Sequence, residues 1–374
     1  MPAPLRSLLR LRVQRFQSTR QSTTERPFST SPRTLNHQPV LLKEVLEQLS
    51  PQSGGWYLDT TFGEGGYSKA LLDRCDCKVM AIDQDPFAIE KAQALADRPE
   101  YRGRLRPILG RFSDIRRLAV ETFQSSEPHF SGIVYDIGIC SSQVDDPSRG
   151  FSYLKDGPLD MRMASKGSLE KDEDAIKQRV GRRTIPASVV VNNFSVDQMA
   201  HLFRVYGEEK FATRIAQEID AARQQQMIST TQQLAEVVYR AVPHSLRQLS
   251  RDNKTWRNPA ARVFQSLRIY VNDELGELQR SLQDAYDLVT PGGRVVVVTF
   301  HSLEDALVKR AFLERQNGST LEDNTGSPDT APPSYTVLTR KVIKPTSDEC
   351  AHNPRARSAK MRVIQRAPEE SPVN

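Results

Sequence analysis

The chain has 374 residues, a formal net charge of +6 and four cysteines. Residues 1–36 contain seven arginines and one glutamate, which account for the whole positive excess, so the net charge says little about what the remaining chain binds. No apolar run approaches the roughly 20 residues of a membrane-spanning helix. The cysteines form no C-x-x-C pair, which argues against a metal site.

The first 35 residues are predicted to be a mitochondrial transit peptide. Residues 1–20 contain five arginines and no acid, and serine and threonine are frequent from there to Thr34. An amphipathic, Arg-rich and acid-poor N-terminus is typical of such peptides. The alternative is a disordered basic tail. We therefore expect the protein in the mitochondrial matrix and exclude residues 1–35 from the fold.

Short apolar runs predict a parallel sheet. They lie at 56–59, 78–83, 105–109, 132–137 and 294–300, and helical patterns separate the first four. Strands that are apolar on both faces are typical of a sheet covered by helices on both sides. Two further strands, at 335–343 and 360–365, are expected to form an antiparallel pair. The pattern predicts a doubly wound α/β domain with seven strands.

A helical domain is predicted to interrupt this sheet. Between residues 146 and 258 no strong strand pattern occurs, and helices are expected at 188–206, 208–225 and 231–241. One long helix is then expected from 259 to 289, because its apolar residues recur every three or four positions. The predicted parts are a transit peptide (1–35), a sheet domain in two pieces (36–145 and 259–366), a helical insertion (146–258), a polar disordered loop (316–334) and a tail (367–374).

A glycine-rich turn at 63–66 follows the first strand and opens a helix. Gly63, Gly65 and Gly66 allow the backbone to approach a ligand closely, and the helix N-terminus offers unpaired N–H groups. Such a turn can bind a pyrophosphate or the amino-acid end of S-adenosylmethionine. The glycine spacing alone is weak evidence for a ligand, because a tight turn that binds nothing would have the same sequence pattern.

Polar side chains at the ends of the next strands complete a candidate cofactor site. Asp83, about 20 residues past the glycines, can accept hydrogen bonds from ribose hydroxyls, whereas Asp85 before Pro86 can equally cap a helix. Phe112 either stacks on an adenine or lies in the core. Asp136 can accept a hydrogen bond from an adenine amine, a methionine amine or a substrate amine, and local sequence does not choose among them.

From His37 to about Arg366 the chain resembles the ribosomal RNA small-subunit methyltransferase H family, also known as MraW. The resemblance is carried by ordered motifs: DTTFGEGGYS at 59–68, AIDQDP at 81–86, RGFS at 149–152, GPLDMRM at 157–163, RVFQSLR at 262–268, TFHSLED at 299–305 and NPRARSAK at 353–360.

The resemblance implies a Rossmann-like S-adenosylmethionine methyltransferase sheet with an inserted helical domain. It also implies N4-methylation of a cytidine in the decoding region of small-subunit ribosomal RNA, free or within an assembling small subunit. The implied cofactor contacts are Gly65, Gly66, Tyr67, Asp83, Phe112, Asp136 and Gln143.

The sequence departs from the family pattern in three places. Tyr67 stands where the family usually has histidine, and Cys140-Ser141-Ser142-Gln143 replaces Ser-Ser-Pro-Gln. Residues 165–187 are a charged insertion beside the family's substrate-side loop. These departures bear on the details of cofactor and RNA contacts more than on the activity.

Methyl transfer to a cytosine N4 requires alignment and hydrogen-bond acceptors rather than a metal or a thiol nucleophile, because the N4 lone pair is delocalised into the ring. The Pro-Pro-aromatic motif of DNA amino methyltransferases is absent. The candidates for facing the substrate are Asp136, Asp160 and His301. For His301 the alternative is a cap on the next helix.

A basic segment at 340–366 is predicted to contact RNA phosphates. The candidate RNA-binding residues are Arg149, Arg162, Arg268, Arg355, Arg357 and Lys360. A solvated basic face is the alternative.

Two other functions are considered. A NAD-dependent oxidoreductase is disfavoured, because the turn reads G-x-G-G and no Tyr-x-x-x-Lys pair stands out. A non-catalytic RNA-binding ribosome-assembly factor that retains the methyltransferase fold is the main alternative. The oligomeric state stays open, with a homodimer among the options.

Overall fold

The computed structural model describes residues 39–164, 185–243, 258–318 and 334–369. The predicted transit peptide lies outside these residues, as do most of the charged insertion and most of the loop at 316–334. Among the described residues, no helix is long and apolar enough to cross a membrane.

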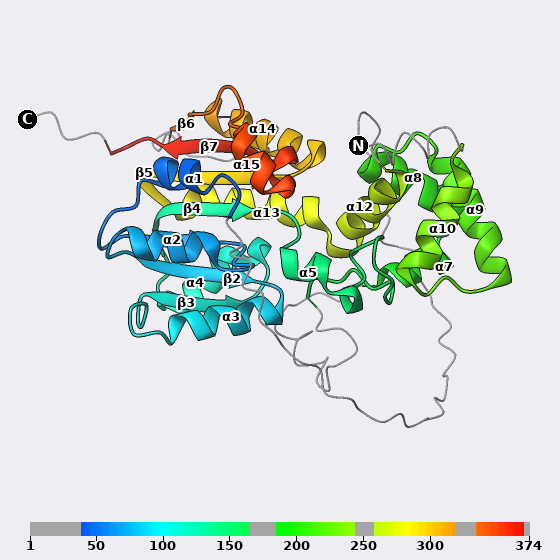
Figure 1. Ribbon diagram of the computed structural model, residues 1–374. Coiled ribbons are helices and arrows are strands. Elements are labelled where there is room, and N and C mark those ends of the chain that lie inside the picture. Colours follow the sequence, from blue (N-terminus) through cyan, green and yellow to red (C-terminus); the bar gives the residue numbers. More distant parts are fainter. Residues whose placement is uncertain (1–38, 165–184, 244–257, 319–333, 370–374) are drawn as a thin grey trace, which may run out of the picture. The chain divides into compact units, whose positions relative to one another are not determined.

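The sheet has seven strands in the order β3-β2-β1-β4-β5-β7-β6 (Figure 1). The first five strands are parallel, and β7 runs antiparallel to both β5 and β6. The strands are β1 (Trp56–Asp59), β2 (Lys78–Asp83), β3 (Leu105–Leu109), β4 (Phe130–Asp136), β5 (Val289–Thr299), β6 (Tyr335–Val337) and β7 (Lys360–Arg366). This confirms the predicted α/β class and the antiparallel pair at its edge.

Helices cover both faces of the sheet because its strands are apolar on both faces. In β2, Val79 and Ala81 enter one core while Met80 and Ile82 enter the other, and all four are fully buried. The first core is covered by α1 (Leu42–Leu49), α2 (Gly66–Arg74) and α3 (Pro86–Ala96). The second is covered by α4 (Ile115–Phe123), α13 (Glu274–Leu288) and α14 (Ser302–Gln316).

The segment between β4 and α13 forms a third hydrophobic core of its own. The helices that pack on one another are α7 (Ala187–Asn193), α8 (Val196–Gly207), α9 (Ala212–Gln225), α10 (Thr231–Ala241) and α12 (Pro259–Asn272) (Figure 1). Two shorter elements, α5 (Ser141–Asp145) and η2 (Pro147–Arg149), precede them in the chain. The predicted helix at 188–206 is two helices, because Ser195 caps α8 in a reciprocal capping box with Gln198.

Two predicted elements were wrong in extent. The long helix at 259–289 is broken between α12 and α13 by Asp273, which has a left-handed backbone (φ 52°). The apolar stripe continues across the break, so periodicity alone does not reveal it. The strand predicted at 335–343 ends at Val337, and only an isolated bridge joins Ile343 to Met361.

Two short elements lie between β6 and β7, α15 (Ser347–His352) and η4 (Pro354–Ser358). A third short element, η1 (Phe112–Asp114), follows β3. Both η1 and η4 contribute to the site described next.

Candidate active site

A cavity of about 370 Å³ lies at the carboxyl ends of β1, β2 and β4. In an open parallel sheet this edge is where ligands bind, at the point where the strand order reverses. Of the predicted cofactor residues, all but Gly65 line it: Gly63, Gly66, Tyr67, Asp83, Phe112, Asp136 and Gln143. The fold therefore brings together residues that lie up to 80 positions apart in sequence.

The glycines of the turn are required by close packing as well as by backbone conformation. Gly65 caps α2 with a left-handed backbone (φ 79°), and Gly63 is also left-handed (φ 55°). A Cβ on Gly66 would lie 2.0 Å from Pro39 Cγ, and one on Gly65 would lie 2.5 Å from the Phe62 ring. A side chain at either position would displace the wall of the cavity.

Asp59, which the sequence analysis did not single out, anchors this turn. Its carboxylate accepts hydrogen bonds from Ser68 Oγ (2.6 Å) and from the Thr61 N–H (3.2 Å). Burial raises the pKa of Asp59 to about 6. Thr61 Oγ1 in turn accepts a hydrogen bond from the Asp136 N–H at 2.8 Å, so the turn is tied to the end of β4. An acid at the strand end just before the glycines was the signal that could have revealed it.

Asp83 and Asp85 have different roles although both lie at the carboxyl end of β2. Asp83 lines the cavity and accepts the N–H groups of Gly63 and Asp85, both at 2.8 Å. Burial, reinforced by the charge of Asp85, raises the pKa of Asp83 to about 7. Asp85 caps α3 by accepting the Phe87 N–H at 3.1 Å, which is the alternative that the sequence left open.

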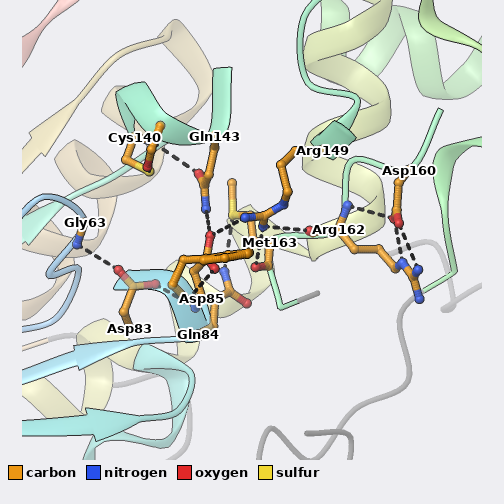
Figure 2. Close-up of polar contacts among 12 residues, drawn as sticks. Gly63, Asp83, Gln84, Asp85, Cys140, Gln143, Arg149, Asp160, Arg162 and Met163 are labelled. Carbon is orange, nitrogen blue, oxygen red and sulfur yellow. Dashed lines mark hydrogen bonds and ion pairs between the residues drawn. The ribbon is translucent and has the colours of Figure 1, made fainter. Parts of the chain in front are cut away.

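A buried polar network extends from Asp85 (Figure 2). Its Oδ2 accepts hydrogen bonds from Gln143 Nε2 at 2.7 Å and from Arg149 Nη1 at 2.8 Å. Arg149 Nη2 also donates to the carbonyl oxygen of Met163 at 3.0 Å. The prediction that Arg149 contacts RNA is therefore wrong, because its side chain is only 4% exposed and its donors are used inside the protein.

Asp136 presents a buried oxygen with no hydrogen-bond partner among the described residues. Its Oδ1 is shielded from solvent, and its side chain lines the cavity. Burial raises the pKa of Asp136 to about 8, and the charges of Asp59 and Glu304 add to the effect. Since buried polar atoms are nearly always paired, this oxygen is suited to a donor supplied by a ligand.

A second polar cluster lies at the junction of α12 and α13. Arg268 makes a bidentate ion pair with Glu274, with Nε–Oε1 and Nη2–Oε2 distances of 2.8 and 2.9 Å. Glu304 Oε1 lies 3.9 Å from Arg268 Nη2 and 2.8 Å from His301 Nε2. Arg268 and Glu274 line the cavity together with Asn272. The sequence analysis missed Asn272 and Glu274 because their partners lie in other parts of the chain.

His301 is not among the residues that line the cavity, and the structure supports the alternative that it caps the next helix. It is 5% exposed and caps α14, its Nδ1 accepting the Glu304 N–H at 3.4 Å. Glu274, His301 and Glu304 lie close enough together to hold a cation. The Arg268 guanidinium already supplies positive charge to both carboxylates, so we assign no metal to this cluster.

Three other predicted residues have internal partners and do not line the cavity. Asp160 and Arg162 pair with each other, with an Arg162 Nε–Asp160 Oδ1 distance of 2.6 Å (Figure 2). Asp160 thus has an ion-pair partner within the protein, and its role of facing the substrate stays a prediction. Lys360 pairs with Asp305 at 3.0 Å on β7.

The two remaining basic candidates lie on η4. Arg355 lines the cavity and donates a hydrogen bond to Ser141 Oγ, with a weaker contact to Asp145 at 3.4 Å. Arg357 is exposed. Arg268 also lines the cavity but is largely buried, so it is not a surface contact for phosphates.

Fold and site together define the class of protein. A seven-stranded Rossmann-like sheet carries, at its switch point, a glycine turn, an acid at the end of β2 and a carboxylate with one unpartnered oxygen at the end of β4, an arrangement suited to a nucleoside-containing cofactor. The model of the MraW methylase family matches residues 34–367, and the chain belongs to this family.

Two relatives of the chain, each 44% identical to it, agree with this assignment. The ribosomal RNA small subunit methyltransferase H of Gluconobacter oxydans is 44% identical over 336 residues, covering 88% of this chain and 92% of the relative. The protein of the same name from Parvibaculum lavamentivorans is 44% identical over 332 residues, covering 88% and 89%. Among solved structures, an rRNA methylase of Streptococcus thermophilus has a TM-score of 0.35 and 9% identity, covering 87% of this chain and 93% of that chain.

Proposed function

We propose that the protein transfers a methyl group from S-adenosyl-L-methionine to N4 of a cytidine in the decoding region of small-subunit ribosomal RNA. Membership of a methylase family and the names of full-length relatives support a small-subunit rRNA methyltransferase. The observation that supports an amine as the methyl acceptor is Asp136, a residue whose buried Oδ1 has no hydrogen-bond partner among the described residues and which lines the cavity together with the glycine turn and Asp83.

The residues of the cavity fit the proposed donor. The unpaired N–H groups at the start of α2 suit the carboxylate of its methionine part, and Asp83 suits the ribose hydroxyls. The ring of Phe112 offers an apolar face for the adenine, since it lines the cavity and meets Tyr135 edge-on at 6.1 Å. S-adenosyl-L-methionine supplies an electrophilic methyl group on a sulfonium.

Asp136 supports the attack by N4. By accepting a hydrogen bond from the amino group, the carboxylate favours a pyramidal nitrogen whose lone pair points at the methyl carbon. The new N–C bond forms as the S–C bond breaks, and the proton lost from N4 passes to Asp136. Because burial raises the pKa of Asp136 to about 8, this step requires the ionised form of the side chain, which is a stronger base than an ordinary carboxylate. The base must be unpaired and extruded from its stack to enter the cavity.

The RNA is proposed to approach across η4. Arg355 is 42% exposed at its side chain and reaches the cavity, and Arg357 is exposed beside it. The side chains of Arg340, Lys341 and Lys344 are exposed on the segment before α15. Phosphate contacts from these positions would position the backbone without specifying the base.

The proposed site of action is the mitochondrial matrix. Support comes from the Arg-rich, acid-free start of the chain and from the family match, which begins only at residue 34. Imaging of the full chain fused to a fluorescent protein, compared with the chain lacking residues 1–35, tests this. N-terminal sequencing of the imported protein would locate the cleavage site. Equal mitochondrial import of both proteins would contradict the proposal.

The activity is tested with the full-length protein, small-subunit ribosomal RNA and methyl-labelled donor. Nuclease digestion and mass spectrometry should show N4-methylcytidine with the wild type and none with Asp136→Asn. Cells lacking the protein should lose the same modification and regain it with the wild-type gene. A non-catalytic assembly factor would restore ribosome assembly equally well with Asp136→Asn, and labelled RNA would be absent with either protein.

A further inference from the structure

We propose that Arg268, held in place by Glu274, recognises the acceptor edge of the target base by donating hydrogen bonds to N3 and O2 of cytosine. This inference rests on the proposed function and makes Arg268 a specificity residue. It replaces the expectation that this arginine contacts phosphates.

Two groups of residues from different elements line the cavity. The proposed cofactor residues come from the turn after β1, the end of β2 and η1, whereas Arg268, Asn272 and Glu274 come from the α12–α13 junction. Asp136 lines the same cavity as both groups, and its backbone N–H donates to Thr61 Oγ1 in the glycine turn. A base that enters this cavity beside Arg268 can therefore also contact Asp136.

Arg268 is fixed before any ligand binds. Two of its three nitrogens are engaged by Glu274, and Asn272 Nδ2 donates to the Arg268 carbonyl oxygen at 2.9 Å. Nη1 has no hydrogen bond to a described residue, and the side chain is 13% exposed in the cavity wall. A guanidinium held in this way offers N–H donors in a fixed direction at little further cost in conformational entropy.

The negative charge around the Arg268 guanidinium favours binding of an uncharged hydrogen-bond acceptor. Two carboxylates, Glu274 and Glu304, flank the one guanidinium. Such a group does not attract a phosphate or a carboxylate, because the surrounding acids would repel the anion. The carbonyl and ring nitrogen of a base carry no net charge and can accept the free N–H groups.

Asp136 and Arg268 together select cytosine over uracil. The pairing edge of cytosine presents one donor, N4, followed by two acceptors, N3 and O2. Asp136 is an acceptor and Arg268 is a donor, so the two side chains match this order. Uracil presents an acceptor at position 4 and a donor at position 3, which would oppose both side chains.

A double-substitution cycle, with one substitution in the enzyme and one in the RNA, tests the proposed contact between Arg268 and N3 of cytosine. The substrate is the short RNA that carries the mapped target cytidine, made with either cytidine or 3-deazacytidine, in which a C–H replaces the N3 acceptor. The enzymes are the wild type, Arg268→Lys and Arg268→Gln, with Arg117→Gln on the exposed face of α4 as the matched control. Single-turnover rates are measured at saturating donor, and donor affinity is measured by calorimetry.

With the wild type and with Arg117→Gln, 3-deazacytidine should lower the rate roughly 10- to 100-fold, the range of one good base contact. Both Arg268 variants should lower the rate on cytidine by a similar factor and be nearly insensitive to the deaza substitution. The deaza substitution also changes the intrinsic reactivity of N4. Comparing the size of the deaza effect between enzymes cancels that change. Donor affinity should stay within about twofold, which also shows that the variants fold.

The inference is overturned if the deaza effect is the same in all four enzymes, or if the Arg268 variants lose donor binding. The latter would assign Arg268 to the cofactor or to the fold. Failure of the proposed function is a separate outcome, because the wild type would then form no N4-methylcytidine on either RNA.

Discussion

Arg149 donates a hydrogen bond to Asp85 at 2.8 Å, and both side chains are nearly inaccessible, at 4% and 3% exposed. The ion pair joins the end of β2 to the segment that leads into the helical part of the chain. Because the same Asp85 oxygen also accepts from Gln143, the pair orients a side chain that lines the cavity. The buried carboxylate of Asp85 thus connects the proposed cofactor site to the segment that leads into the helical part.

Arg149→Met should destabilise the protein strongly, because it leaves Asp85 buried without its counter-charge. Loss of one partner of a buried pair typically costs about 3–5 kcal/mol. Denaturant unfolding of the ligand-free protein measures this. Arg117→Met, which removes an exposed arginine from α4, should change stability by less than about 1 kcal/mol. Equal effects of the two variants would show that the pair is not stabilising.

Asp136→Asn should abolish methylation while leaving the fold intact. The amide keeps the shape of the side chain but cannot take a proton, so kcat should fall about 10²- to 10⁴-fold. Donor affinity, measured by calorimetry, should change little if Asp136 faces the substrate amine. A large loss of donor affinity instead would assign Asp136 to the amine of the donor.

Stability of the ligand-free protein should fall as the pH rises from about 4 to 8. The pKa of Asp136 is about 8 in the folded protein against 3.8 as the ordinary value, so the folded state holds a proton that the unfolded state has lost. Stability from this group is fully present below pH 3.8 and is lost as the pH passes 8. Asp136→Asn should flatten the decline by at most about 1.4 kcal/mol per pH unit. An unchanged slope would show that Asp136 is already ionised.

Tyr67→Phe should retain activity and lose a little stability. The buried Tyr67 hydroxyl donates to the Val40 carbonyl oxygen, and an unpaired carbonyl costs about 1–3 kcal/mol. Tyr67→His, the residue usual in the family, should support methylation at a comparable rate. Thermal unfolding and initial rates measure both. An inactive Tyr67→Phe would mean that the hydroxyl takes part in the reaction.

Arg357→Gln should weaken RNA binding without affecting donor binding. The side chain is exposed on η4, so a phosphate contact would contribute about one counterion to the salt dependence. Affinity for the RNA, measured at several salt concentrations, should show a slope smaller by about 1. A variant with the wild-type slope would place the RNA elsewhere.

Local sequence predicted those site residues whose position is determined mainly by adjacent residues in the chain. The glycine turn and Asp83 follow strand ends and were placed correctly at the cavity. The roles of Arg149 and His301 depend on partners that local sequence does not identify. Arg149 meets Asp85 from 64 positions away, and His301 could equally cap a helix or face a ligand. Some arginines were predicted to contact RNA because they are positively charged, but the fold buries their side chains.

The break at Asp273 also escaped prediction, because apolar periodicity continues through it. Its cause is long-range: Asn272 Oδ1 accepts the Met163 N–H at 2.9 Å, and Asn272 Nδ2 donates to the Met161 carbonyl oxygen at 2.8 Å. These bonds join the end of α12 to a segment more than 100 positions earlier.

The helical part has a hydrophobic core separate from the two cores of the sheet, and buried polar bonds at Asn272 and Arg149 help to join it to them. Apolar substitutions within that core can accumulate without altering the sheet, provided the joining side chains are kept. Such an arrangement lets the helical part and the sheet part accumulate substitutions largely independently of each other. Chimaeras that exchange the helical part between relatives should therefore fold when Asn272 and Arg149 are retained.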